Sequence, residues 1–296
     1  MPFFPSRLVL LLALAASAVV SPLRAAPPAD RQGGETRDLV YGRAGGHDLK
    51  LDLYRPSGSA RDGGKSRPVV LFLHGGGWRF GSKEEGARFA DRFTSRGFVF
   101  ASADYRLSGE ALWPAPIHDA KTAVRFLCAN ARRYGLDPAR IGVCGTSAGG
   151  HLAALLGTTP GVVALEDRSQ GSPRASDRVQ AVCDVSGPTD IAIQPSTFIG
   201  RYYVRHEFGG TAQEKPDLAR QADPSRYVHG GEPPFFLIYG ARDRLVLPEH
   251  ARRLQDALRT HGGRVTLDLV PGGGHVPLRG EEQQAEIVAF FQQHLR

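Results

Sequence analysis

The chain has 296 residues, of which 41% are hydrophobic and 23% charged, the composition of an ordinary globular protein. Its formal charge at pH 7 is +7, but its arginines are scattered and form no basic run. We therefore expect a solvated surface and no nucleic-acid partner. The length favours one domain, whose core is large enough to need no disulfide bonds.

The first residues have the pattern of a secretory signal peptide. Arg7 precedes a continuous apolar run over residues 8–20, and small residues with Pro22 follow that run. The run is short for a membrane anchor, which needs about 20 apolar residues, so we expect cleavage after Ala25 or Ala26 and no stable anchor. The expected organisation is a signal peptide, a linker and one folded domain, over residues 1–25, 26–35 and 36–296 respectively. Such a protein is secreted or periplasmic.

Three cysteines are present, so at least one thiol has no partner within the chain. Cys144 and Cys183 fall in apolar runs that predict buried strands, where a free cysteine packs as a small hydrophobic residue. A bridge between these two remains open at this stage. The spacing of the cysteines with Cys128 does not match a metal site, and we expect neither a metal nor a cofactor.

Apolar runs predict a series of strands. Strict alternation over residues 49–54 predicts a half-exposed strand. Continuous apolar runs predict strands that are covered on both faces. These runs cover residues 69–73, 98–101, 141–144, 179–185 and 235–239. A further strand near the C-terminus is predicted over residues 265–270.

Helical segments separate these strands. Apolar residues recur at helical spacing over residues 117–127, 148–156, 251–258 and 287–295. Residues 190–227 form a longer segment that we expect to be irregular. Strands that alternate with helices predict a single α/β domain, with a mostly parallel sheet and helices on both faces.

The motif Gly-Thr-Ser-Ala-Gly over residues 145–149 lies between a predicted strand and a predicted helix. Glycines at this spacing allow a turn that exposes the Ser147 hydroxyl above a helix N-terminus. The motif alone occurs by chance in many proteins. A serine hydroxyl also needs an adjacent base and an acid that orients this base.

Two loops that follow predicted strands supply such partners. Asp243 lies just beyond the strand over residues 235–239, and His275 lies in a glycine loop beyond the strand over residues 265–270. The order Ser147, Asp243, His275 is that of a strand-turn-helix serine hydrolase. Asp184 is the alternative acid, because it too ends a predicted strand.

A glycine-rich loop follows the strand over residues 69–73. Its sequence, His-Gly-Gly-Gly-Trp over residues 74–78, lets backbone N–H groups approach a substrate. We expect the N–H groups of Gly76, Gly77 and Ala148 to form an oxyanion hole. Trp78 is expected to bind substrate, and His74 to hold the loop. A phosphate-binding loop is the alternative, but its Gly-Lys-Ser/Thr ending is absent here.

These motifs resemble those of the α/β-hydrolase superfamily. The resemblance extends from about residue 49 to the C-terminus and is carried by residues 74–78, 81–83, 104–107, 145–152, 184–190 and 240–248. Within the superfamily, the chain is similar to a bacterial esterase/lipase group that includes hormone-sensitive-lipase-like and feruloyl or acetyl-xylan esterase-like members. The resemblance implies that Ser147, Asp243 and His275 hydrolyse carboxylic esters through an acyl-serine intermediate.

One departure from the hormone-sensitive-lipase relatives concerns the cap. These relatives often carry a substantial N-terminal cap, whereas here we expect little or none, with residues 190–227 forming either a partial lid or ordinary surface packing. An open site suits small-molecule or carbohydrate-linked esters with short acyl groups. The alternatives are an arylformamidase-like amide hydrolase and a non-catalytic binding protein on the same fold.

Overall fold

The computed structural model describes residues 34–57, 66–193, 197–278 and 280–296. The expected signal peptide lies outside these residues. So does the expected linker, except for its last two residues, the second of which, Glu35, begins the first strand. No helix in the described part of the chain has both the length and the apolar composition that a membrane span requires.

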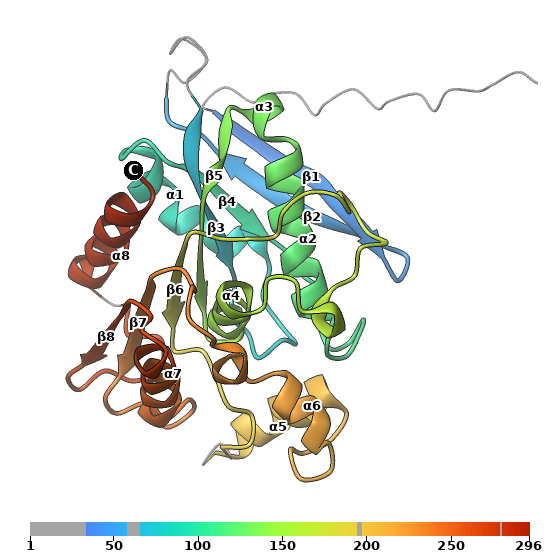
Figure 1. Ribbon diagram of the computed structural model, residues 1–296, viewed down its shortest axis with the longest axis vertical. Helices are drawn as coiled ribbons and strands as arrows, with labels where there is room; N and C mark the ends of the chain where they lie inside the picture. The colour runs from blue at the N-terminus through green and yellow to red at the C-terminus, as the bar shows by residue number, and fades with distance from the viewer. Residues whose placement is uncertain (1–33, 58–65, 194–196, 279) are drawn as a thin grey trace, which may run out of the picture.

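A single eight-stranded sheet runs through the molecule in the order β1-β2-β4-β3-β5-β6-β7-β8 (Figure 1). Strand β2 pairs antiparallel with both β1 and β4, and all other pairings are parallel. The strands are β1 Glu35–Ala44, β2 His47–Tyr54, β3 Arg67–Leu73, β4 Val99–Ala103, β5 Leu136–Thr146, β6 Ala181–Val185, β7 Phe235–Gly240 and β8 Val265–Val270. The mostly parallel sheet confirms the expected fold class.

Strand β1 was not predicted from the sequence. Its pairing with β2 shifts register between Thr36 and Leu39 and again between Val40 and Gly42. Each such irregularity interrupts the alternation of apolar and polar residues by which an exposed strand is recognised.

Helices cover both faces of the sheet (Figure 1). Their bounds are α1 Ala87–Thr94, α2 Ala115–Ala129, α3 Ala131–Tyr134, α4 Ala148–Thr158, α5 Phe198–Phe208, α6 Pro216–Gln221, α7 Pro248–Thr260 and α8 Glu281–His294. Three short 3₁₀ helices are η2 Lys83–Gly86, η3 Val163–Leu165 and η4 Pro224–Tyr227. Side chains of α2, α4 and α7 form the core on one face, and those of α1 and α8 form the core on the other.

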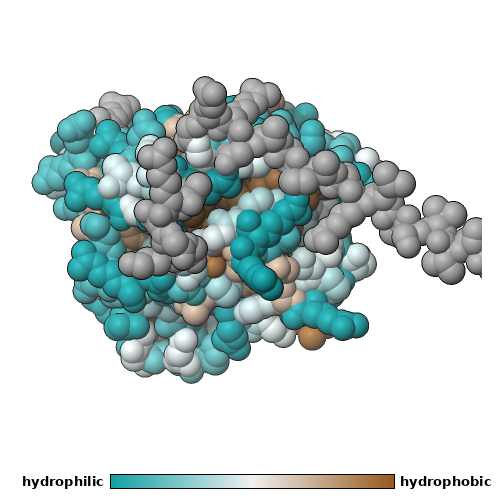
Figure 2. All heavy atoms as spheres, turned by 90° about the horizontal axis from the view of Figure 1, so that it is seen from above, coloured by the Kyte–Doolittle hydropathy of each residue, from teal (hydrophilic) through white to brown (hydrophobic). Residues whose placement is uncertain are grey.

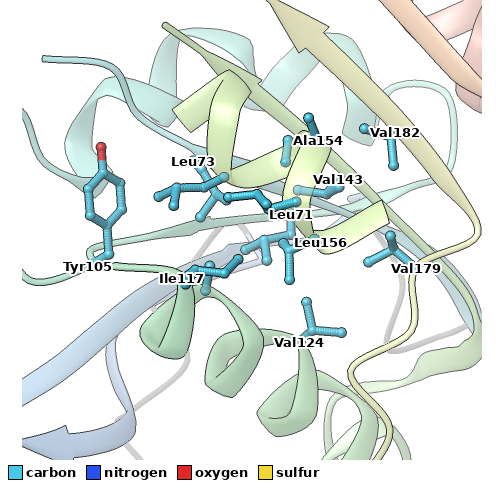
Figure 3. Close-up of a cluster of buried hydrophobic side chains, with 14 of the residues drawn as sticks. Leu71, Leu73, Tyr105, Ile117, Val124, Val143, Ala154, Leu156, Val179 and Val182 are labelled. Carbon is cyan, nitrogen blue, oxygen red and sulfur yellow. The ribbon is translucent and has the colours of Figure 1, made fainter. Parts of the chain in front are cut away.

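Alternation along β3 supplies both cores. Leu71 packs with Ile117 and Leu156 on the α2 and α4 face, as Figure 3 shows, whereas Val70 and Phe72 belong to the opposite core. Successive side chains of a strand point to opposite faces, so a strand that is covered on both faces must be apolar throughout. This explains the continuous apolar run from which β3 was predicted.

Residues 190–227 are more regular than expected. The described part of this segment contains α5, α6 and η4, which corrects the expectation of an irregular segment. Two signals in the sequence mark α5: the Thr197 hydroxyl accepts a hydrogen bond from the Gly200 N–H at 3.1 Å, and Gly209 ends the helix at a φ of 64°. Figure 1 shows α5 and α6 together at one end of the molecule.

The opposite end of the molecule is mixed, with mostly hydrophilic residues and some apolar ones toward the middle of the face (Figure 2). Figure 2 views the molecule from above the orientation of Figure 1, and hydrophilic residues dominate the visible surface of the described chain. Such a surface is what the scattered charges of the sequence predict.

Cys144 and Cys183 are neighbours in register on β5 and β6. Both are free thiols buried in the core beneath α1 and α8, and Cys128 is also free. The structure thus shows Cys144 and Cys183 as packing residues.

Candidate active site

Ser147 lies in the turn between β5 and α4 with φ 54° and ψ −118°. A Cβ atom on Gly145 would lie 2.1 Å from the Gly149 carbonyl oxygen, and one on Gly149 would lie 2.1 Å from the Leu73 carbonyl oxygen. Both glycines of the motif are therefore required by close backbone contacts. The Ser147 N–H donates to the Val185 carbonyl at 2.8 Å, which holds the turn against β6.

Ser147, His275 and Asp243 form a chain of hydrogen bonds. His275 Nε2 lies 2.9 Å from Ser147 Oγ, and His275 Nδ1 lies 2.7 Å from Asp243 Oδ2. An ionised carboxylate only accepts hydrogen bonds, so Nδ1 donates to Asp243 and Nε2 is left to accept the serine proton. The structure thus brings together the three side chains that were selected from three separate loops.

Backbone contacts hold the loop that carries His275. A Cβ atom on Gly240 would lie 2.1 Å from the Gly274 carbonyl oxygen, so the β7 and β8 loops pack directly on each other. The Arg242 N–H donates to the Gly273 carbonyl at 2.8 Å, and the Val276 N–H donates to Ser186 Oγ at 3.2 Å. These contacts fix the position of the imidazole relative to Ser147.

Asp184, the alternative acid, has other partners. Gly187 N–H donates to its Oδ1 at 2.8 Å, and Tyr239 Oη lies 2.8 Å from its Oδ2 and 2.5 Å from the Gly187 carbonyl. The Tyr239 hydroxyl is the donor in both contacts, and in the protonated form of Asp184 the carboxyl proton can instead be donated to Tyr239 Oη. Burial raises the Asp184 pKa to about 7. Asp243, and not Asp184, contacts His275.

The glycine-rich loop after β3 has a strained backbone. Gly76, Gly77 and Trp78 have φ values of 109°, 60° and 58°. The N–H groups of Arg79 and Phe80 both donate to the Gly76 carbonyl at 3.1 Å, which closes a tight turn. Two of these three positions therefore need glycine for conformational reasons.

This loop lies beside the Ser147 turn. A Cβ atom on Gly75 would lie 3.4 Å from Ser147 Cβ. Within the described residues, the N–H groups of Gly76 and Gly77 have no assigned acceptor. Ala148 begins α4, so its N–H has no partner within that helix. These three N–H groups are available for an oxyanion.

His74 supports the loop. Its Nδ1 donates to the Gly75 carbonyl at 2.7 Å, its ring stacks on Tyr105 at 4.3 Å, and the Tyr105 hydroxyl donates to the His74 carbonyl at 2.9 Å. Burial lowers the His74 pKa to about 4, so this imidazole is neutral. His74 thus has the structural role that we expected.

A small pocket, with a volume of about 50 Å³, opens beside Ser147 and Ala148. Trp78, the predicted substrate-binding residue, lines it, and its ring also packs edge-on against His151 and Phe208. The remaining walls, which were not named as site residues from the sequence, come from the loops after β6 and β7, from α5 and from the start of α7, and include Ile191, Tyr203, Val204, Leu245 and His250. The i, i+3, i+4 spacing of Gly200, Tyr203 and Val204 after the Thr197 cap is the signal that would have found α5 as a wall.

No group of three or more His, Cys, Asp or Glu side chains suited to a metal ion occurs in the described ranges of the chain.

The BD-FAE family model matches residues 51–258. The chain belongs to the BD-FAE family. This BD-FAE member is 31% identical over 256 residues to esterase LipQ of Mycobacterium tuberculosis, covering 84% of this chain and 58% of LipQ. It is 35% identical over 222 residues to esterase LipC of the same organism, covering 71% of this chain and 53% of LipC. The chain thus spans somewhat more than half the length of these relatives.

Solved structures of esterases share the fold of this BD-FAE member. A truncated carbohydrate esterase from gut microbiota superposes with a TM-score of 0.77 at 25% identity, covering 89% of this chain and 98% of that one. A bifunctional GH43-CE protein of Bacteroides eggerthii gives 0.80 at 32% identity, covering 89% and 38%. Butyrate-bound Est2 of Thermogutta terrifontis gives 0.74 at 25% identity, covering 88% and 94%. The expected α/β-hydrolase fold and esterase group are confirmed.

Proposed function

We propose that this protein is a serine hydrolase of carboxylic esters that works through an acyl-serine intermediate. The observation that carries the proposal is the hydrogen-bond chain from Ser147 through His275 to Asp243. The family membership and the relatives named as esterases agree with it.

The geometry supports a two-step reaction. His275 Nε2 takes the proton of Ser147 Oγ as this oxygen attacks the ester carbonyl carbon, and Asp243 stabilises the imidazolium. The N–H groups of Gly76, Gly77 and Ala148 stabilise the oxyanion. His275 then gives its proton to the alcohol as the ester C–O bond breaks. In the second step His275 activates a water molecule, which releases the acid from Ser147.

The position of the pocket separates the two halves of the substrate. The leaving alcohol must reach His275 to receive its proton. The pocket contacts Ser147 and Ala148 but not His275, so we assign it to the acyl group. Its restricted volume favours short acyl groups, and Est2 structures hold butyrate and propionate.

The alcohol half lies on the open side of the site in this proposal. Neighbouring structures named as a carbohydrate esterase and a GH43-CE protein support carbohydrate-linked esters as substrates alongside small-molecule esters. The apolar run over residues 8–20 supports action in the periplasm or outside the cell, after signal-peptide cleavage.

Hydrolysis of p-nitrophenyl acetate tests the proposal. Ser147→Ala is expected to lower kcat by at least about 10³-fold, because the nucleophile and the base act as one unit. Ser95→Ala, at an exposed serine that follows α1, is the matched control and is expected to keep full activity. Activity that survives Ser147→Ala would refute the mechanism.

A fluorophosphonate probe provides an independent readout. It is expected to label Ser147 in the wild-type protein and to leave the Ser147→Ala variant unlabelled, in line with the sarin-phosphonylated structure of Est2. Turnover of an N-formyl aromatic amine in preference to acetate esters would favour the arylformamidase alternative. A wild-type protein that neither hydrolyses esters nor reacts with the probe would favour the binding-protein alternative.

A further inference from the structure

Two buried polar side chains line the otherwise largely apolar acyl pocket. They are Asp190, in the loop after β6, and His250, in the first turn of α7. Both are at most 5% exposed. Neither has a role in the proposed reaction, and a buried polar group beside an apolar pocket commonly orients a ligand.

The backbone around His250 determines which ring nitrogen carries the proton. The Asp190 N–H donates to His250 Nδ1 at 3.2 Å, so Nδ1 is an acceptor and the proton of a neutral ring is on Nε2. The Thr189 hydroxyl donates to the His250 carbonyl at 2.8 Å and ties the same loop to α7. Burial lowers the His250 pKa to about 4, which keeps the ring neutral near pH 7.

The two side chains differ in what they leave available to a ligand. Asp190 Oδ1 accepts the Ala192 N–H at 2.8 Å, and Asp190 Oδ2 pairs with the Arg253 guanidinium. The hydrogen bond assigned to the His250 ring within the described residues is the one at Nδ1, and no acceptor is assigned there to Nε2–H. His250 Nε2–H is therefore an oriented, uncharged donor at the pocket, and the buried indole N–H of Trp78, which also lines the pocket, is another donor without a partner in the described part of the chain.

We infer that His250 is a specificity-determining residue whose Nε2–H donates a hydrogen bond to an uncharged oxygen on the acyl chain of the substrate. This inference rests on the proposed ester hydrolysis and on the assignment of the pocket to the acyl group. The enzyme then prefers acyl chains with an ether, hydroxyl or keto oxygen over alkanoyl chains of the same length, because an alkanoyl chain leaves the buried donor unpaired.

Isosteric ester pairs test this preference in the wild-type protein. The p-nitrophenyl esters of methoxyacetic and butanoic acid differ by an oxygen in place of a methylene, as do those of 3-methoxypropanoic and pentanoic acid. For each pair, the ratio of kcat/KM is divided by the ratio of hydroxide-catalysed rates, which removes intrinsic reactivity. We expect a corrected preference of about fivefold for the oxygen-containing ester in at least one pair.

Two variants separate the pocket donor from the structural acceptor. In His250→Asn the side-chain oxygen can still accept the Asp190 N–H, but the donor at Nε2 is lost. In His250→Gln the amide nitrogen reaches the Nε2 position, but the acceptor at Nδ1 is lost. We expect the corrected preference to disappear in His250→Asn and to persist in His250→Gln.

The outcomes are distinct. A corrected ratio near one for both pairs in the wild type, or a preference that survives His250→Asn, overturns the inference and leaves ester hydrolysis intact. If His250→Gln lowers kcat/KM equally for all esters and His250→Asn leaves the preference unchanged, His250 has a purely structural role. That result also overturns the inference. A wild-type protein that hydrolyses none of the esters overturns the proposed function and this inference together.

Discussion

At the scale of single residues, the two oxygens of Asp243 have different partners. Oδ1 accepts the N–H groups of Leu245 and Val246 at 2.8 and 3.0 Å, and Oδ2 faces His275 Nδ1 at 2.7 Å. The first pair of bonds fixes the carboxylate plane, so the second oxygen is aimed at the imidazole. These contacts determine how an amide in place of the Asp243 carboxylate would face His275.

Asp243→Asn is expected to lower kcat by about 10⁴-fold. The amide oxygen will keep the two backbone N–H groups, so the amide nitrogen will face His275 Nδ1 and force the ring proton onto Nε2. That nitrogen can then no longer accept the Ser147 proton. Steady-state kinetics with p-nitrophenyl acetate measure the loss. Asp184→Asn is the control, expected to stay within about tenfold of wild type, and a larger loss there than in Asp243→Asn would contradict the assignment.

Asp184 makes stability depend on pH. Burial raises its pKa from 3.8 to about 7, so between these values the folded state holds a proton that the unfolded state has released. The contribution of Asp184 to the free energy of unfolding is complete below about pH 4. It falls by roughly 1.4 kcal/mol per pH unit as the pH rises to 7.

Asp184→Asn is expected to remove this dependence, because an amide keeps both hydrogen bonds of the protonated acid. The measurement is the free energy of unfolding in urea from pH 5 to pH 8. Wild type should lose stability relative to the variant as the pH rises towards 7. Parallel curves for the two proteins would show that Asp184 is ionised throughout.

At the scale of elements, α5 connects the segment between β6 and β7 to the glycine-rich loop. A Cβ atom on Gly77 would lie 2.4 Å from the Tyr203 ring, and Phe208 packs on Trp78 with ring centroids 6.0 Å apart. The backbone N–H of Trp113 donates to the Glu207 carbonyl at 3.0 Å, near the end of the same helix. The helix therefore closes the pocket and supports the loop that we assign to the oxyanion.

Gly77→Ala is expected to lower kcat/KM for p-nitrophenyl acetate by more than about tenfold, because the new methyl group overlaps the Tyr203 ring and displaces α5 or the loop. Adding Tyr203→Ala should restore part of the loss. The remainder reflects the positive φ of residue 77. Gly46→Ala is the control, since Gly46 also has a positive φ of 84° but an added Cβ meets open space. A double variant no better than Gly77→Ala would contradict this account.

At the scale of the whole molecule, the sheet separates two cores that respond differently to substitution. Phe291 of α8 packs over Gly142 of β5, where a Cβ atom would lie 2.5 Å from its ring. The core beneath α1 and α8 lies on the face opposite α2, α4 and α7, whereas the site lies where the strands end. We therefore expect a substitution in the core beneath α1 and α8 to lower stability without lowering activity.

Phe291→Ala is expected to lower the free energy of unfolding by about 3–5 kcal/mol through the cavity that it leaves. Denaturant titration measures this loss, and kcat per site, counted with a fluorophosphonate probe, should stay close to wild type. Val163→Ala, at a side chain that is 84% exposed, is the control and should change stability by less than about 0.5 kcal/mol. An equal fall in kcat would show that this core also positions the site.

The local pattern of the chain was enough for most of the fold and for the candidate triad. Continuous apolar runs identify strands covered on both faces, and the glycines around Ser147 mark a turn that only small residues allow. Asp243 and His275 follow from the same logic, because the carboxyl ends of parallel strands meet at one edge of the sheet. Strand β1 and helix α5 were missed, since register shifts obscure the first, and the exposed apolar residues Phe198 and Ile199 obscure the helical spacing of the second.

Only the tertiary structure decided which groups meet across the sheet edge. Asp184 and Asp243 both end strands, and their different neighbours, Tyr239 and His275, distinguish them. The proton position on His250 likewise depends on the Asp190 N–H, which is 60 residues away in the chain. The sequence by itself determined the strand-turn-helix context of Ser147 because neighbouring residues impose it. The acyl pocket and its donor depend on contacts between distant segments, which local spacing does not encode.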